Sequence, residues 1–175
     1  MTEIQHAYLV SRGDSSSQAT VGTTYCQIFA VDEIDLDRLD AAWGKVQKRH
    51  GMMRASVEED GTQSIAPSSK IGHIERAECA NSSEAKQQLE EIKRTVFALA
   101  KPPLHRVVSI SWHEESGKQT RLVFCFDYTV LDALSVMTVL AELAELYENP
   151  GADLPGIGLT FRDFVVGHRR DGRRG

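Results

Sequence analysis

The sequence predicts an α/β (α+β) two-layer sandwich, in which helices cover a mostly antiparallel sheet. Two long apolar segments follow one another across a tight turn, which is typical of antiparallel strands. Segments with apolar residues three or four positions apart lie between the predicted strands, so each predicted helix has one face to bury. No glycine-rich phosphate loop follows a strand, which argues against a dinucleotide-binding fold.

The first part of the chain predicts two helices around one strand. Residues 2–10 are predicted to form a short helix, and residues 13–22 a polar loop. Residues 24–31 are rich in β-branched and aromatic side chains, which favours a strand. Helical spacing then predicts an amphipathic helix over residues 36–50. Its apolar positions are Leu36, Leu39, Trp43 and Val46.

The middle of the chain predicts a hairpin and a short strand. Residues 53–58 and 62–66 are expected to pair across Glu59-Asp60-Gly61, where glycine supplies the positive φ that such a turn needs. A further strand is predicted near residues 74–79.

A second amphipathic helix is predicted after that strand. Ser82-Ser83 are expected to cap its N-terminus. Pro102-Pro103 are expected to stop it, because proline lacks the amide hydrogen and clashes with the preceding turn. Its apolar positions are Ala85, Leu89, Ile92 and Val96.

The last part of the chain predicts the centre of the sheet. Residues 104–112 and 119–126 form two long strands that turn at Ser116-Gly117. The second strand is apolar on both faces, so we expect it to be central. Residues 132–147 predict a mostly buried helix, because their polar residues form one narrow stripe. Residues 160–163 resemble a capping box that opens a last helix.

Composition excludes several classes of protein. The chain has 175 residues, 41% hydrophobic and 26% charged, which fits one domain or one lobe with a buried core. No apolar run is long enough to cross a bilayer, and residues 1–20 lack a secretory pattern, so no membrane partner is expected. The net charge of −5 argues against nucleic acid as the main partner. The widely spaced Cys26, Cys79 and Cys125 predict neither a disulfide framework nor a zinc site, and favour the reducing cytoplasm.

The candidate site lies where the second long strand ends. This apolar strand runs into Asp127, and a buried carboxylate costs free energy unless it is paired, so Asp127 is a functional candidate. Asp132 opens the next helix, which it can cap, and Ser135 follows on the polar stripe of that helix. Arg54 and Arg106 lie in predicted strands, and either could meet the two carboxylates.

The histidines are weaker candidates. His50 ends a helix and His105 sits in a strand, and neither has the spacing of a metal-ligand motif, so both are expected to be structural. No metal site is predicted.

Four segments resemble the motifs of one family. Residues 127–135 look like the DxxxxDxxS signature of heterocyclization domains of nonribosomal peptide synthetases, which are relatives of condensation domains. Residues 2–12 are similar to the opening motif, with Ser11 in place of its glycine. Residues 48–54 resemble the R-H-x-x-L-R motif, and residues 159–164 the stretch that closes the first lobe. The four matches keep the family's order and spacing.

The resemblance implies one lobe of the chloramphenicol-acetyltransferase-like fold. Residues 1–167 would be the N-terminal lobe, and the arginine-rich residues 168–175 a basic tail or an interrupted interlobe linker. On matching positions, Asp127, Asp132 and Ser135 would be the catalytic motif residues, and Arg54 the ion-pair partner of Asp132 that supports the site.

The resemblance also implies an activity. The family condenses a carrier-bound acyl or peptidyl thioester with carrier-bound Cys, Ser or Thr, and closes a thiazoline or oxazoline ring. The partners would be peptidyl or acyl carrier proteins, whose phosphopantetheine arms enter between two lobes. No cofactor is expected to be bound by this chain itself.

The missing second lobe leaves alternatives open. Positioning two tethered substrates needs both walls of the site, so a separate second lobe or a homodimer would have to complete it. The chain could instead be a non-catalytic docking or structure-completing subunit of the same fold. Chance matches in an unrelated sandwich are disfavoured by the four ordered motifs. Met1 falls inside the opening motif, which favours a natural start over an excised lobe.

Overall fold

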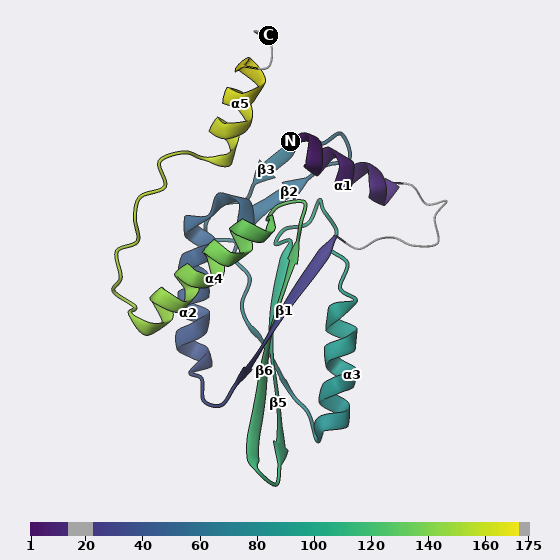
Figure 1. Ribbon diagram of the computed structural model, residues 1–175, viewed down its shortest axis with the longest axis vertical. Helices are drawn as coiled ribbons and strands as arrows, with labels where there is room; N and C mark the ends of the chain where they lie inside the picture. The colour runs from purple at the N-terminus through teal and green to yellow at the C-terminus, as the bar shows by residue number, and fades with distance from the viewer. Residues whose placement is uncertain (14–22, 172–175) are drawn as a thin grey trace.

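The computed structural model describes residues 1–13 and 23–171. Figure 1 shows an elongated body in which the sheet runs lengthwise beside its helices. The predicted mixed α/β fold with a mostly antiparallel sheet is confirmed. The elements are α1 (Glu3–Gly13), β1 (Thr24–Val31), α2 (Leu36–Arg49), η1 (Gly51–Arg54), β2 (Ala55–Val57), β3 (Gln63–Ile65), β4 (Glu75–Glu78), α3 (Ser82–Lys93), β5 (His105–Glu114), β6 (Gly117–Asp127), α4 (Ala133–Glu148) and α5 (Phe161–Asp171).

The main sheet has the strand order β1-β6-β5-β4. β6 pairs antiparallel with β1 and with β5, which confirms its predicted central position. β4 pairs with β5 in parallel. The predicted hairpin is also present, as the separate pair β2 and β3, and Gly61 in its turn has φ of +80°.

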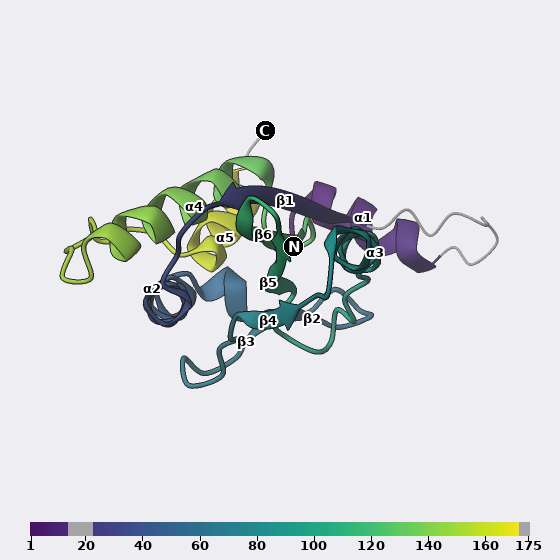
Figure 2. The same cartoon turned by 90° about the horizontal axis from the view of Figure 1, so that it is seen from below.

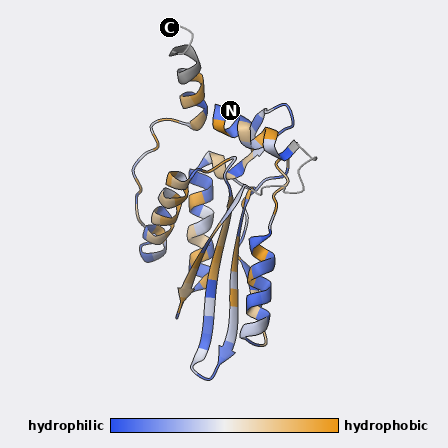
Figure 3. Cartoon of the chain, turned by 45° about the vertical axis from the view of Figure 1, so that its right-hand side comes forward, coloured by the Kyte–Doolittle hydropathy of each residue, from blue (hydrophilic) through white to orange (hydrophobic). Residues whose placement is uncertain are grey.

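Helices cover both faces of this sheet, which adds a third layer to the two that were expected (Figure 2). On one face α2 and α4 bury Trp43, Val46 and Val139 against the sheet residues Phe124 and Phe126. On the other face α3 covers a smaller cluster. Figure 3 shows α4 mainly in the hydrophobic colour and α3 mainly in the hydrophilic colour.

The ends of α3 differ from the prediction. Asn81 caps the helix, because its side-chain oxygen accepts the backbone N–H groups of Ser83 and Glu84, each at 3.0 Å. The helix ends at Lys93, well before the two prolines. After the helix the chain passes beside the hairpin, where the Val57 N–H donates to the Leu99 carbonyl at 2.8 Å.

The expectation that α4 is mostly buried was wrong. Its core face is narrow and consists of Val136, Val139, Leu143 and Leu146. On the opposite face Leu134 is 73% exposed and Met137 is 69% exposed. An exposed apolar face on a helix is typical of a site that binds another protein surface.

One part of the prediction about the cysteines, that they form no disulfide framework, was wrong for one pair. Cys26 on β1 lies directly opposite Cys125 on β6, with 4.2 Å between their Cα atoms, and the two form a disulfide. Cys79 is free. The sequence could not show this pairing, because the two cysteines are 99 residues apart and only the strand register brings them together.

The C-terminal segment leads away from the body. After α4 the chain runs without regular structure to α5, which stands beyond the sheet in Figure 1. α5 begins as predicted, since the Asp163 carboxylate accepts the Thr160 hydroxyl at 2.6 Å. It continues to Asp171, so residues 168–171 of the basic segment are helical. The predicted polar loop over residues 13–22 lies, after its first residue, outside the described residues.

Within residues 1–13 and 23–171, no helix combines the length and the apolar character that crossing a bilayer requires.

Candidate functional site

Asp127 is held in a fully satisfied, buried position at the end of β6. Its side chain is 0% exposed and forms an ion pair with Arg12. One carboxylate oxygen accepts the Thr23 hydroxyl at 3.0 Å and the Thr129 N–H at 2.9 Å. A buried carboxylate with such partners is stable where an isolated one would not be. Asp127 is therefore placed to hold together α1, the residue that precedes β1 and the loop that follows β6.

Helix α1 places Arg12 next to Asp127. The Gln5 side-chain amide donates to the Thr129 carbonyl at 2.8 Å, which fixes the start of α1 on the loop after Asp127. From the last turn of α1, Arg12 reaches Asp127 and also donates to the Phe97 carbonyl at 3.1 Å. Arg12 was not among the arginines predicted to meet Asp127. Its position as the last residue of the opening motif was the available signal.

Asp132 occupies the N-cap of α4, as its structural interpretation predicted. Its carboxylate accepts the Ser135 N–H at 2.8 Å. Hydrogen bonds from the side chain and the backbone of Ser135 hold the pKa of Asp132 below its usual value. Asp132 is exposed and Ser135 is half-buried. Of the two aspartates, Asp132 is the one that a substrate could reach.

Replacing Asp132 with alanine is expected to cost about 1 kcal/mol of stability, because α4 loses its N-cap. The measurement is urea unfolding followed by circular dichroism. Asp132→Asn is the matched control, since asparagine caps as well as aspartate and should keep most of the stability. An equal loss in both variants would contradict the capping role and point to the charge instead.

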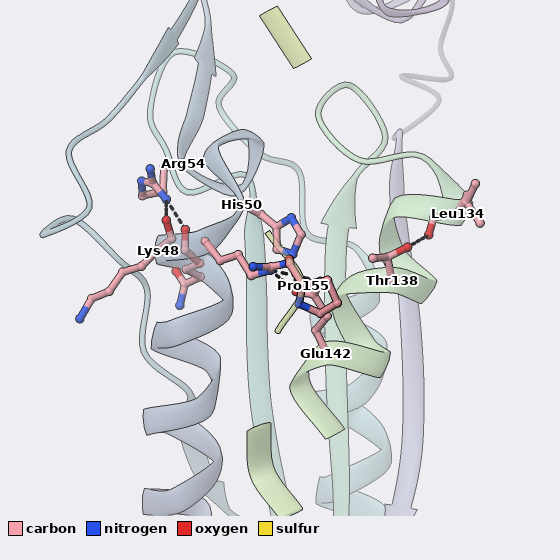
Figure 4. Close-up of polar contacts among 9 residues, drawn as sticks. Lys48, His50, Arg54, Leu134, Thr138, Glu142 and Pro155 are labelled. Carbon is pink, nitrogen blue, oxygen red and sulfur yellow. Dashed lines mark hydrogen bonds and ion pairs between the residues drawn. The ribbon is translucent and has the colours of Figure 1, made fainter. Parts of the chain in front are cut away.

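Arg54 does not support the site as expected. Its guanidinium donates to the backbone carbonyls of Gln47, Lys48 (2.9 Å) and Ala66 (3.1 Å), as Figure 4 shows in part. The reason is local, because Arg54 ends η1 directly after α2, where the last helical carbonyls lack partners. The predicted Arg54–Asp132 ion pair is therefore wrong.

Arg106 does not meet the aspartates either. Its guanidinium binds the Glu75 carboxylate on the neighbouring strand β4, with two contacts of 2.7 Å. This pair lowers the pKa of Glu75, chiefly through the side-chain hydrogen bond from Arg106.

His50 joins three parts of the fold. Its Nε2 lies 2.6 Å from the Glu142 carboxylate of α4 (Figure 4). Arg49 binds the same carboxylate at 3.0 Å. Arg49 in addition donates to the Pro155 carbonyl, in the segment that leads to α5. The cluster ties the end of α2 to α4 and to that segment, so the predicted structural role of His50 is confirmed.

His105 is a buried, neutral histidine. Its ring packs edge-on against Trp43, with 5.1 Å between the ring centroids. Burial lowers the pKa of His105 to about 4, although a hydrogen bond with the Met53 backbone partly offsets this effect. The structural role expected for His105 is confirmed.

The described residues hold no group of three or more His, Cys, Asp or Glu side chains that could bind a metal ion. At the start of α4 the structure places one exposed carboxylate (Asp132), one half-buried hydroxyl (Ser135) and the exposed apolar face of the helix.

One family model matches this chain. The model describes the condensation domain and matches residues 1–173.

Several long synthetases are similar to the chain over nearly its whole length. Phenyloxazoline synthase MbtB of Mycolicibacterium paratuberculosis is 30% identical over 173 residues, which is 94% of this chain and 14% of the relative. Pyochelin synthetase PchF of Pseudomonas aeruginosa is 28% identical over 94% of this chain and 9% of the relative. Bacitracin synthase 1 of Bacillus licheniformis is 28% identical over 95% of this chain and 3% of the relative. The chain thus spans a small part of each.

Solved structures share the fold. The EpoB cyclization-docking bidomain from Sorangium cellulosum superposes with a TM-score of 0.84 at 28% identity, covering 97% of this chain and 34% of that one. The nonribosomal peptide synthetase FmoA3 gives a TM-score of 0.80 at 26% identity, covering 100% of this chain and 17% of the other.

Proposed function

The chain belongs to the condensation-domain family of nonribosomal peptide synthetases, and on that premise we propose that it is the N-terminal lobe of a heterocyclization-type condensation domain. The observation that carries the proposal is the corner formed by Arg12, Asp127, Asp132 and Ser135. In it the opening motif and the signature motif meet through a buried ion pair. The relatives named for oxazoline and cyclization chemistry support the heterocyclization type.

The reaction proposed takes place on thioesters. The amine of a carrier-bound Cys, Ser or Thr attacks the thioester carbonyl of a second carrier, forms the amide and releases the carrier thiol. The Cys thiol or the Ser or Thr hydroxyl then attacks the new amide carbonyl, which closes the five-membered ring, and loss of water forms the C=N bond of the thiazoline or oxazoline. Carrier proteins bearing phosphopantetheine arms are the proposed partners, and the cytoplasm is the proposed compartment.

The two aspartates would have different roles in this reaction. Asp127 is enclosed and paired with Arg12, so it would act as a positioning residue for the loop that leads to Asp132. Asp132 and Ser135 lie at the start of α4, where they could contact substrate. An exposed carboxylate with a lowered pKa is ionised at neutral pH, and is suited to accept a hydrogen bond from a substrate.

We propose that a second lobe, or a second copy of the chain, completes the site. The exposed Leu134 and Met137 on α4, and Phe164 on α5 at 54% exposure, are apolar surface suited to an interface. The chain also spans only 34% of the EpoB bidomain chain, which leaves room for another lobe in the relatives.

The test is reconstitution. The chain is mixed with a separately expressed second lobe and two loaded carrier proteins, and the products are followed by mass spectrometry. We expect Asp132→Asn, which keeps the helix cap, to slow product formation by about a hundredfold. Arg76→Ala, at an exposed ion pair with Asp37, is the matched control and should leave the rate unchanged. Wild-type rates in Asp132→Asn would contradict a catalytic role for Asp132.

A non-catalytic subunit is the second candidate function. The observation that favours this alternative is that Asp127 is fully buried and paired with Arg12, where it holds the fold and does not face a substrate. It predicts that the immobilised chain binds carrier proteins. It also predicts that the reconstitution assay gives no product with any second lobe. Product formation in any pairing would contradict it.

A further inference from the structure

We propose that the disulfide between Cys26 and Cys125 is a reversible redox lock on strand β1. Among the strands that the structure describes, only β6 pairs with β1, so β1 is an edge strand held by a single ladder. A strand that is paired on one side only has a free edge and fewer ladder hydrogen bonds than a central strand. A covalent bond from β1 to the central strand therefore acts at an edge of the sheet.

The register of the strands builds the bond into the fold. Cys26 and Cys125 are direct partners in the antiparallel ladder, with 4.2 Å between their Cα atoms, so the register itself brings the two sulfur atoms together. Cys125 is fully buried, whereas Cys26 is half-buried. Because 99 residues separate the two cysteines, closing the bond removes much conformational freedom from the unfolded chain.

The lock acts next to the candidate site. Thr24, two residues before Cys26, is the ladder partner of Asp127. Thr23, just before β1, donates its hydroxyl to the Asp127 carboxylate at 3.0 Å. Opening of β1 would therefore remove one of the groups that hold Asp127, and the disulfide resists that opening.

Forming the disulfide between Cys26 and Cys125 requires an oxidant. A low-molecular-weight disulfide such as oxidised glutathione can act as that oxidant. The Cys26 thiolate attacks one sulfur of the glutathione disulfide, which forms a mixed disulfide and releases one glutathione thiol. The Cys125 thiol loses its proton and displaces the second glutathione. Two electrons pass from the protein thiols to glutathione. Reduction runs in reverse, starting at the half-buried Cys26 sulfur.

The experiment follows the 175-residue chain in glutathione buffers from reducing to oxidising. The samples are quenched in acid, unfolded, alkylated with iodoacetamide and weighed intact. We expect three alkylated cysteines in reducing buffer and one in oxidising buffer. Hydrogen exchange of the β1 amides is expected to be on the order of thirtyfold slower in the oxidised protein, and its Tm is expected to be higher.

Two kinds of variant separate the lock from a general effect of redox conditions. Cys79→Ser should keep the full response, because Cys79 is the free cysteine. Cys26→Ser should abolish it, and Cys26→Ala replaces that variant if serine prevents folding. Three alkylated cysteines in every buffer would overturn the proposal. So would a disulfide that includes Cys79, or equal β1 exchange in both states.

Discussion

Replacing Arg12 with alanine is expected to destabilise the fold by about 3–5 kcal/mol, because it breaks a buried ion pair. This is the largest loss of stability expected here for any single substitution. The reason is the carboxylate left behind. Asp127 is 0% exposed, so without Arg12 its charge would be buried with only the neutral donors Thr23 and Thr129. The measurement is urea unfolding at pH 7, followed by circular dichroism and by tryptophan fluorescence.

A double variant isolates the cause of that loss. Combining Arg12→Ala with Asp127→Asn removes both charges, so it should recover a measurable part of the stability that Arg12→Ala alone loses. The exposed pair of Arg76 and Asp37 is the matched control, and Arg76→Ala should leave the unfolding midpoint unchanged. If the double variant is no more stable than Arg12→Ala, the lost free energy comes from packing rather than from the unpaired charge.

This ion pair connects stability with the proposed function. Arg12 lies in α1 and Asp127 at the end of β6, 115 residues apart, and their contact joins the opening motif to the signature motif. A substitution of Arg12 or Asp127 would disturb the loop that leads to Asp132. It would therefore change activity indirectly, through the position of Asp132. For this reason Asp132→Asn is a sharper test of catalysis than Asp127→Ala.

Local patterns were enough to predict most elements of the fold. β1 was predicted to the residue, because its β-branched and aromatic content is a property of neighbouring positions. The central position of β6 followed from its apolar residues on both faces. Ends of elements were less predictable. α3 takes its cap from Asn81 instead of Ser82, a choice that depends on side-chain geometry.

Contacts between distant segments could not be predicted from local pattern. The disulfide depends on the register between β1 and β6, and the partner of Asp127 depends on how α1 docks. Arg54 was expected to reach Asp132, but its guanidinium donates to the carbonyls at the end of α2 that have no partner within the helix. The sequence could show that Asp127 needed a partner, but the choice among the arginines required the fold.

The stability of the protein is expected to fall as the pH is lowered from about 6.5 toward 4, because His105 is buried in its neutral form. The pKa of His105 is about 4 in the folded protein and near the ordinary value of 6.5 in the unfolded chain. Between these values the unfolded chain binds a proton that the folded protein does not, so acid favours unfolding. The loss attributable to His105 is about 2 kcal/mol at pH 5 and about 3 kcal/mol at pH 4 and below.

The measurement is the free energy of unfolding in urea at half-unit steps from pH 7.5 to pH 4.5. His105→Asn cannot take up the proton, so the difference in stability between wild type and this variant should shrink as the pH falls. His113, which is exposed near the other end of the same strand β5, is the matched control, and His113→Asn should follow the wild-type curve. If wild type and His105→Asn lose stability in parallel, other groups cause the acid sensitivity, and His105 is protonated in the fold more readily than its burial against Trp43 implies.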